Sequence, residues 1–219
     1  MRDFSKFFGF AFSSLLPLIN PLGGALVFLG IVGIAPSAVY RMLARKIAIS
    51  TTIFLLTIEA IGTALLKFFG ISVPVMQVAG GFALAAMGWS LLNQTESDKN
   101  KKQPQVDCAN LHELKQKVFY PLTFPITAGP GCIVVMVTLS AHASTLRMLP
   151  AIAAHTGIVT AVVFLSIAVY FCYGYAPTIT ARVSPQTAHG ILRVIAFVLL
   201  CIGIQITWNG VAAMLKTLL

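Results

Sequence analysis

Charge is scarce in this sequence. Of its 219 residues only 10% are Asp, Glu, Lys or Arg, with six acidic and 15 basic, while 58% are hydrophobic. Soluble domains carry roughly 25% charged residues and roughly 45–50% apolar ones. Together with a mean hydropathy of +0.89, this composition excludes an ordinary soluble domain and indicates a chain that lies in a lipid bilayer.

Cysteines and catalytic motifs are equally scarce. Cys132, Cys172 and Cys201 lie in apolar stretches and Cys108 lies in a polar loop, without CxxC or Cys/His ligand spacing. We therefore expect neither a disulfide framework nor a metal site. The sequence contains no HExxH, GxSxG or GxxxxGK motif, and one acidic residue lies inside an apolar stretch. We expect no enzyme, no cofactor and no direct use of ATP.

Long apolar runs are what the sequence has in abundance. A spanning helix needs about 20 mostly apolar residues. The first run is too long for a cleaved signal peptide and is expected to stay in the mature protein. We predict an all-α membrane protein with six transmembrane helices, placed at Phe8–Val32, Ile47–Leu66, Ile71–Leu92, Val118–Ala141, Leu149–Tyr173 and Ile191–Leu215.

The formal net charge of +9 does not indicate a nucleic-acid-binding protein, because the basic residues flank the apolar runs instead of lining one polar face. Counted on alternate sides of six spans, five Lys and Arg lie on one side and ten on the other. Since the cytoplasmic side carries the excess, we expect both termini outside and the 94–117 loop in the cytoplasm as a flexible tether. The ten are Arg41, Arg45, Lys46, Lys99, Lys101, Lys102, Lys115, Lys117, Arg182 and Arg193.

The two halves of the chain look related. Aligning Pro17 with Pro125 also aligns Gly23 with Gly131, a faint match of the kind that chance can produce in apolar sequence. Each half holds three spans, and an odd number forces the second copy to insert upside down. We therefore predict two inverted three-helix repeats, each with a broken first helix. The divisions are 1–93 for the first repeat, 94–117 for the cytoplasmic loop and 118–219 for the second repeat.

Proline and glycine interrupt the first span of each half at corresponding depth, in PLINPLGG and PITAGPGC. Asn20 before Pro21, and Gly129 before Pro130, are typical of a helix that starts anew. Freed backbone groups cannot face lipid, so both breaks must face protein or a water-filled cavity. One break alone is better explained as a packing kink, whereas two in register favour a binding site.

The starts of the two half-helices define the candidate substrate site. Their first N–H groups and the positive ends of their dipoles attract a carboxylate or another anion. Glycines keep the approach free of side chains, and a threonine hydroxyl lies beside the second break. The residues concerned are Asn20, Pro21, Gly23, Gly24, Thr127, Gly129, Pro130 and Gly131.

Three segments resemble the MarC family of integral membrane proteins: LLPLINPLGG near the start, GISVPVMQVAGGFALAAMGWSLL in the third span and PLTFPITAGPG at the opening of the second half. The resemblance runs along essentially all of the chain. It implies a six-helix inner-membrane protein with both termini outside. Characterised relatives carry small neutral amino acids such as glycine and alanine, coupled to the proton gradient.

The family's motif positions fall on Asn20, Pro21, Gly23, Gly80, Gly81, Ala128, Gly129, Pro130 and Gly131. Ala128 thereby joins the candidate substrate-binding residues. In one departure, Gly24 and Ala25 offer no hydroxyl, which leaves Asn20 as the side chain on the first break that can contact a substrate.

Polar residues inside the other spans carry alternative interpretations. Glu59 is the proton-coupling candidate, because an acid within a span is costly, but a place near the outer end also fits an interfacial residue. Arg193 is either a gate or a side chain that reaches the headgroups, and His155 is either a proton relay or a packing residue. Gly80 and Gly81 are expected to let the third helix pack closely against a broken neighbour.

We therefore predict a secondary transporter of small neutral amino acids that works by alternating access around two half-helix starts at midmembrane. The alternative is a channel or exporter for another small solute or ion, although no ring of charge or filter-like repeat is present. The expected partners are a small-molecule substrate and the lipid bilayer, with a second copy of the chain left open.

Overall fold

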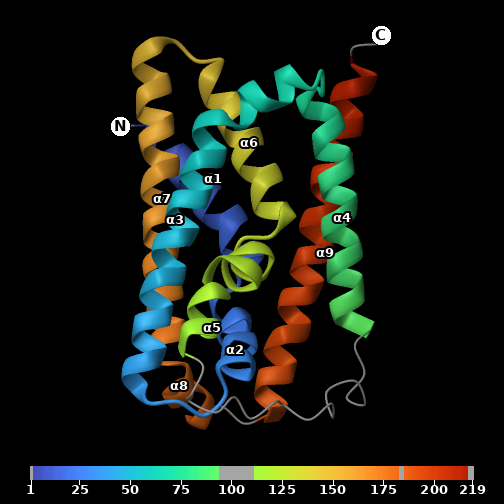
Figure 1. The fold of residues 1–219 in the computed structure, drawn as a ribbon. Coiled ribbons are helices and arrows are strands. Elements are labelled where there is room, and N and C mark those ends of the chain that lie inside the picture. The colour runs from blue at the N-terminus through green and yellow to red at the C-terminus, as the bar shows by residue number, and fades with distance from the viewer. Residues whose placement is uncertain (1, 94–110, 183–184, 217–219) are drawn as a thin grey trace.

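The structure is a computed structural model that describes residues 2–93, 111–182 and 185–216. These residues are helical throughout, apart from short connections (Figure 1). Five helices are long and apolar enough to cross a membrane, and a bent helix pair makes up to six. The all-α prediction is therefore confirmed. The elements are α1 (Arg2–Ile19), α2 (Pro21–Val32), α3 (Ser37–Phe68), α4 (Val73–Asn93), α5 (Leu111–Gln116), η3 (Val118–Thr127), α6 (Pro130–Ser144), α7 (Met148–Gly174), α8 (Ala176–Arg182) and α9 (Pro185–Leu215).

Several helices extend beyond the apolar runs that predicted them. Helix α3 begins at Ser37 and not at Ile47. Its extra turns carry Arg41, Arg45 and Lys46, whose charged ends reach water at the membrane surface while the backbone hydrogen bonding continues. Hydropathy therefore locates the part of a helix that lies in hydrocarbon and misses its interfacial turns.

The predicted 94–117 loop is helical at its end, where α5 spans Leu111–Gln116. Residues 94–110 lie outside the described part of the chain. A second short helix, α8, follows α7 directly at Ala176–Arg182.

Helix α7 is the centre of the larger part of the bundle, because α1, α2 and α3 all pack against it. On α1, the residues Ala11, Leu15 and Ile19 are fully buried, and their spacing of four places them on one face of the helix. Close approach is possible because Gly157 of α7 lies against α1: a Cβ at this position would be 2.6 Å from the Phe4 carbonyl oxygen.

Helices α4 and α9 form a tight pair that lies beside this body (Figure 1). Glycines bring the two backbones into direct contact: a Cβ at Gly81 would lie 2.5 Å from the Thr207 nitrogen, and one at Gly203 would lie 2.4 Å from the Ala85 nitrogen. Small residues of this kind are the usual means of close helix packing in membranes. The pair contacts the rest of the bundle mainly through α6.

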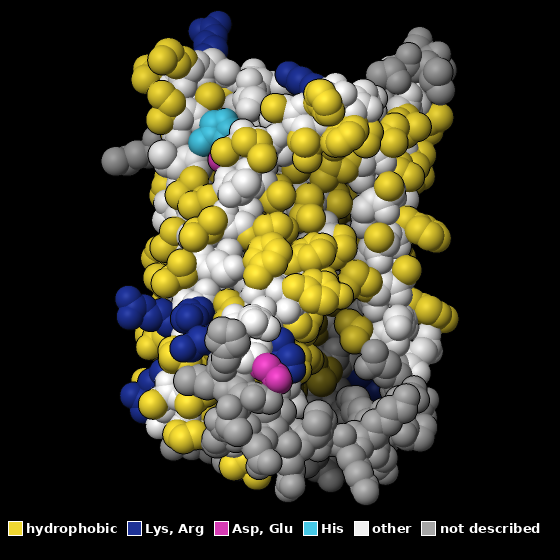
Figure 2. Space-filling view, in the orientation of Figure 1, with side chains coloured by type: hydrophobic (Ala, Val, Ile, Leu, Met, Phe, Trp, Pro, Cys, Tyr) yellow, Lys and Arg dark blue, Asp and Glu magenta, His cyan; other side chains and the backbone are white. Residues whose placement is uncertain are grey.

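The surface follows the pattern of a membrane protein. Apolar side chains cover much of the middle of the visible face, and Lys and Arg gather mainly toward one end, over the start of α3 and α5 (Figure 2). The N-terminal end of α1 and the C-terminal end of α9 both lie in the opposite half of the bundle (Figure 1).

Candidate functional site

The first span breaks at a single residue, Asn20. Its backbone is left-handed, with φ 42° and ψ 67°, a conformation that Asn adopts more readily than most residues. The Asn20 Oδ1 accepts a hydrogen bond of 3.0 Å from the Gly23 N–H, and Pro21 takes the first helical position, where no donor is needed. Helix α2 therefore begins inside the bundle with a side-chain cap, as the Asn-Pro pair predicts.

The fourth span breaks more sharply. The axes of η3 and α6 are bent by 69°, with Gly129 as the N-cap of α6 and Pro130 at its first position. Before the break, η3 is irregular, with extended backbone at Tyr120 and Phe124. The hydroxyls of Thr123 and Thr127 donate to the carbonyls five residues earlier, at 2.8 and 2.7 Å. Proline at position 125 supplies no N–H to this segment, so hydroxyl groups complete part of its hydrogen bonding.

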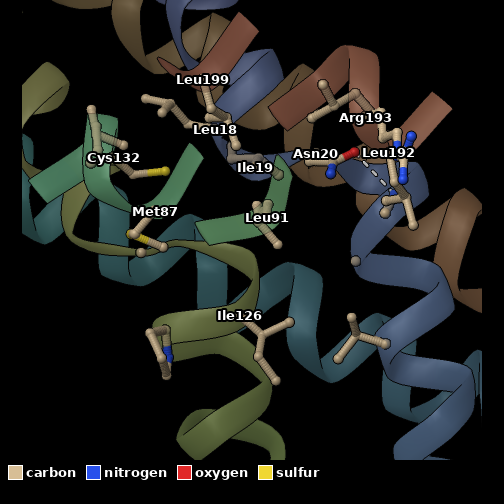
Figure 3. Close-up of a pocket in the computed structure, with 18 of the residues that line it drawn as sticks. Leu18, Ile19, Asn20, Met87, Leu91, Ile126, Cys132, Leu192, Arg193 and Leu199 are labelled. Atoms are coloured by element: carbon tan, nitrogen blue, oxygen red, sulfur yellow. Dashed lines mark hydrogen bonds between the residues drawn. The ribbon is translucent and has the colours of Figure 1, made fainter. Parts of the chain in front are cut away.

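A cavity of about 680 Å³ lies between the two breaks and the α4–α9 pair (Figure 3). Its volume falls within the range of about 300–1,000 Å³ that small-molecule sites occupy. The wall is made by the breaks themselves, by the second half of α4 and by the first half of α9. The cavity residues, as we call them below, are Leu18, Ile19, Asn20, Gly23, Gly24, Val27, Leu84, Met87, Leu91, Pro125, Ile126, Gly129, Gly131, Cys132, Gly190, Leu192, Arg193, Ile195 and Leu199.

The structure divides the predicted substrate-binding residues into two groups. Five of them line the cavity, namely Asn20, Gly23, Gly24, Gly129 and Gly131, and so does the gate candidate Arg193. Four do not line it, namely Pro21, Thr127, Ala128 and Pro130. Thr127 and Ala128 are completely buried. In this structure the second group shapes the breaks and does not face the cavity.

Thr127 is engaged with a residue that sequence reasoning missed. Its Oγ1 lies 2.9 Å from the hydroxyl oxygen of Tyr173 on α7. The same Tyr173 hydroxyl lies against the other break, since a Cβ at Gly24 would be 2.1 Å from it. The Tyr173 ring is fully buried and stacks on Phe28 of α2, with centroids 5.0 Å apart. Tyr173 thus connects both breaks through one side chain.

Arg193 supplies a positive charge to the cavity. It makes no hydrogen bond or ion pair with any described residue, and no Asp or Glu is among the cavity residues. In Figure 3 the side chains of Arg193 and Asn20 lie on the same side of the cavity. Asn20 and Arg193 are its strongly polar side chains, so its polarity favours a bound anion.

Glu59 lies outside the cavity and has a partner that the sequence did not predict. Its Oε1 contacts the Nδ1 of His155 on α7. Exposure of the two side chains is 11% for Glu59 and 33% for His155. The backbone carbonyl of Glu59 also accepts a hydrogen bond of 2.8 Å from the Ser140 hydroxyl on α6. The cluster therefore links α3, α6 and α7.

The glycine pair on α4 faces two neighbours. A Cβ at Gly80 would lie 2.0 Å from Cγ2 of Val134 on α6, whereas Gly81 faces the backbone of α9 at Thr207. Gly80 therefore allows α4 to approach the broken fourth span, and Gly81 allows it to approach α9. In the part of the chain that the structure describes, no three His, Cys, Asp or Glu residues lie close enough together to hold a metal ion.

The fold defines an integral membrane protein with a cavity between two interrupted spans. The family model described as MarC family integral membrane protein matches residues 5–215, and the chain belongs to this family. It is 29% identical to the inner membrane protein MarC of Salmonella typhimurium over 235 residues, which cover 99% of each chain. It is 28% identical to the inner membrane protein MarC of Escherichia coli strain SMS-3-5 over 228 residues, again covering 99% of each.

No solved structure matches the chain. Its relatives are inner membrane proteins, and its helices are long enough to span a bilayer several times. The chain is therefore a multi-pass inner membrane protein.

Proposed function

We propose that this protein is a secondary transporter of small neutral amino acids, coupled to the proton gradient, that works by alternating access around its two interrupted spans. The observation that carries the proposal is the cavity shared by both breaks. Interrupted helices that meet at a cavity inside the bundle are a recurring feature of secondary transporters.

The breaks offer groups for both charges of an amino acid. The start of α6 and the start of α2 present the positive ends of helix dipoles toward the substrate carboxylate. Pro130 has no N–H to donate to the Ile126 carbonyl four residues earlier, and Ile126 lines the cavity. In the proposal, the Ile126 carbonyl accepts a hydrogen bond from the substrate ammonium.

The packing supports two inverted repeats. If a twofold axis relates α1–α4 to η3–α9, then α4 corresponds to α9 and α3 corresponds to α7. The two members of each corresponding pair are in extensive contact. The same axis relates the contact between α1 and α7 to a contact between the η3–α6 span and α3. Both contacts are present. Two inverted three-span repeats put both termini on one side of the membrane and the 94–117 loop on the other. The excess of Lys and Arg on the loop side favours the cytoplasm for that side and the outside for the termini.

With this orientation the cavity belongs to an inward-facing state. It is lined by the second half of α4 and the first half of α9, which lie toward the cytoplasmic end. On the outer side, Gly131 rests against Leu84: a Cβ at Gly131 would be 2.2 Å from Leu84 Cδ2. Alternating access then corresponds to a movement of the α4–α9 pair against the body built around α7.

Glu59 is the proposed proton site. It is a largely buried carboxylate within a span, and such groups in membrane proteins mark proton pathways. Because it lies outside the cavity, it acts on transport through α3, α6 and α7, which its contacts with His155 and Ser140 hold together.

The proposal treats the protein as a carrier and not as an enzyme, a channel or a nucleic-acid-binding protein. Its partners are a small-molecule substrate and the lipid bilayer, and it needs no cofactor. A channel is disfavoured because the cavity residues contain one charged side chain and no ring of charge.

Uptake by purified protein in liposomes tests the proposal. An imposed proton gradient is expected to drive saturable uptake of labelled neutral amino acids, and a protonophore is expected to abolish it. The variant Gly131→Val, whose side chain meets Leu84, is expected to reduce uptake at least ten-fold. Gly30→Val is the matched control, because nothing lies within 4 Å of a Cβ at Gly30. Absence of uptake for all neutral amino acids contradicts the proposal.

A further inference from the structure

We propose that the substrate of this cavity is a carboxylate attached to an aliphatic group larger than the methyl group of alanine, with the carboxylate at Arg193 and the aliphatic part against α4. The inference rests on the proposed function and narrows its substrate class. It departs from the glycine and alanine that the family resemblance implies.

Aliphatic side chains form most of the cavity wall. On α4, Leu84, Met87 and Leu91 are spaced by three and four residues and so share one face of the helix. Further aliphatic residues face the cavity from α1, α2, η3 and α9, namely Leu18, Ile19, Val27, Ile126, Leu192, Ile195 and Leu199. Glycine or alanine would leave this wall in contact with water, whereas each methylene group buried there improves affinity about four-fold.

The cavity is also larger than the smallest amino acids need. Its volume of about 680 Å³ lies in the upper half of the range of about 300–1,000 Å³ that small-molecule sites occupy. A substrate with a longer aliphatic group displaces more water from the apolar wall, which is favourable.

The charge of the cavity indicates which polar group the substrate carries and where this group binds. Arg193 is the positively charged cavity residue and has no acidic partner among the described residues. A guanidinium group matches the two oxygens of a carboxylate with parallel hydrogen bonds. Asn20 lies on the same side of the cavity (Figure 3), so the polar end of the substrate belongs here and the aliphatic end against α4.

An aliphatic amino acid and a simple aliphatic carboxylate share this chemistry. The two are distinguished by whether the amino group contributes to binding. An amino group would use backbone carbonyls such as that of Ile126, since no acidic side chain lines the cavity.

Binding to the purified full-length protein in lipid nanodiscs, measured by calorimetry, tests the inference. The probes are leucine, 4-methylpentanoate, alanine, glycine and leucinamide, which lacks the carboxylate. We expect leucine or 4-methylpentanoate to bind at least ten-fold more tightly than alanine and glycine, and leucinamide to bind at least ten-fold more weakly than leucine. Equal or tighter binding of alanine or glycine overturns the inference, as does absence of binding by all five probes or unimpaired binding of leucinamide.

Two pairs of variants locate the binding. Gly190→Leu places an aliphatic side chain in the cavity, at a position where nothing lies within 4 Å of an added Cβ. It is expected to weaken binding of the larger carboxylate at least five-fold. Gly30→Leu, outside the cavity, is its control. Arg193→Gln is expected to weaken the same binding at least ten-fold, with partial recovery in Arg193→Lys, whereas Arg147→Gln leaves it unchanged.

Failure of the inference and failure of the transport proposal give different results. Uptake of alanine and glycine with no preference for larger aliphatic substrates overturns the inference and leaves transport standing. Tight binding of leucine without gradient-driven uptake of any amino acid overturns the transport proposal and leaves the binding site standing.

Discussion

The hydroxyl oxygens of Thr127, beside the second break, and Tyr173, on α7, lie 2.9 Å apart in the interior of the bundle. Both side chains are completely buried. The Tyr173 hydroxyl also lies against Gly24, just after the first break. One phenol group therefore contacts both interrupted spans.

Tyr173→Phe removes the hydroxyl and leaves the ring stacked on Phe28. We expect the free energy of unfolding to fall by about 1 kcal/mol, the usual net value of one internal hydrogen bond, and uptake to fall because the breaks are less firmly positioned. Thermal unfolding in detergent and uptake in liposomes measure the two effects. Tyr170→Phe on the same helix is the control, and equal behaviour of the two variants contradicts the role given to Tyr173.

Gly24→Ala tests the contact from the other side. The new methyl carbon would lie 2.1 Å from the Tyr173 hydroxyl, so the ring must move and its bond to Thr127 is expected to break. Combining Gly24→Ala with Tyr173→Phe removes the clashing oxygen. We expect the double variant to be more stable than Gly24→Ala alone in thermal unfolding. If the effects of the two substitutions on the free energy of unfolding are additive, the contact with the Tyr173 hydroxyl does not explain why position 24 requires glycine.

Asn20 is expected to matter both as a cap and as a left-handed residue. Asn20→Ala loses both properties and is expected to cost about 1–2 kcal/mol of stability, whereas Asn20→Gly keeps the backbone freedom and costs a few tenths, roughly as helix caps behave elsewhere. Denaturant or thermal unfolding of the two variants measures the difference. A Gly variant as unstable as the Ala variant contradicts this explanation.

Replacing Glu59 tests coupling. Glu59→Gln keeps the shape of the side chain and removes its charge, so we expect substrate exchange to persist while gradient-driven uptake falls at least ten-fold. His155→Gln is expected to act in the same direction, because it removes the partner that positions the carboxylate. Glu113→Gln, on the exposed surface of α5, is the control. Unchanged dependence on the proton gradient in Glu59→Gln removes the proposed role.

Local sequence signals predicted the features that depend on local physics. Apolar runs locate the membrane-length helices, because hydrocarbon excludes charge and requires about 20 apolar residues for each span. Asn20-Pro21 and Gly129-Pro130 predicted new helix starts, and the structure begins α2 and α6 at these prolines. These features can be predicted without knowing which helices pack against each other.

Features that depend on distant residues were not predictable in this way. Glu59 and His155 lie 96 residues apart, and nothing in either neighbourhood indicates the other. Tyr173 is one of several tyrosines near the end of the fifth span, and only the packing of α7 against both breaks distinguishes it. Thr127 was expected to face the substrate, but its hydroxyl points into the protein, toward Tyr173 and the Leu122 carbonyl.

The central claim, that both breaks face one water-filled cavity, is tested most directly by thiol labelling in a variant whose four native cysteines are replaced by serine or alanine. Met87→Cys on α4 lines the cavity, whereas Phe82→Cys on the same helix replaces a side chain that is 71% exposed on the outer surface. We predict that a membrane-impermeant thiol reagent applied from the cytoplasmic side labels Met87→Cys rapidly, and Val27→Cys on α2 likewise, while Phe82→Cys stays unlabelled. Labelling of Met87→Cys and Val27→Cys that is as slow as that of Phe82→Cys would contradict the cavity and the transport mechanism built on it.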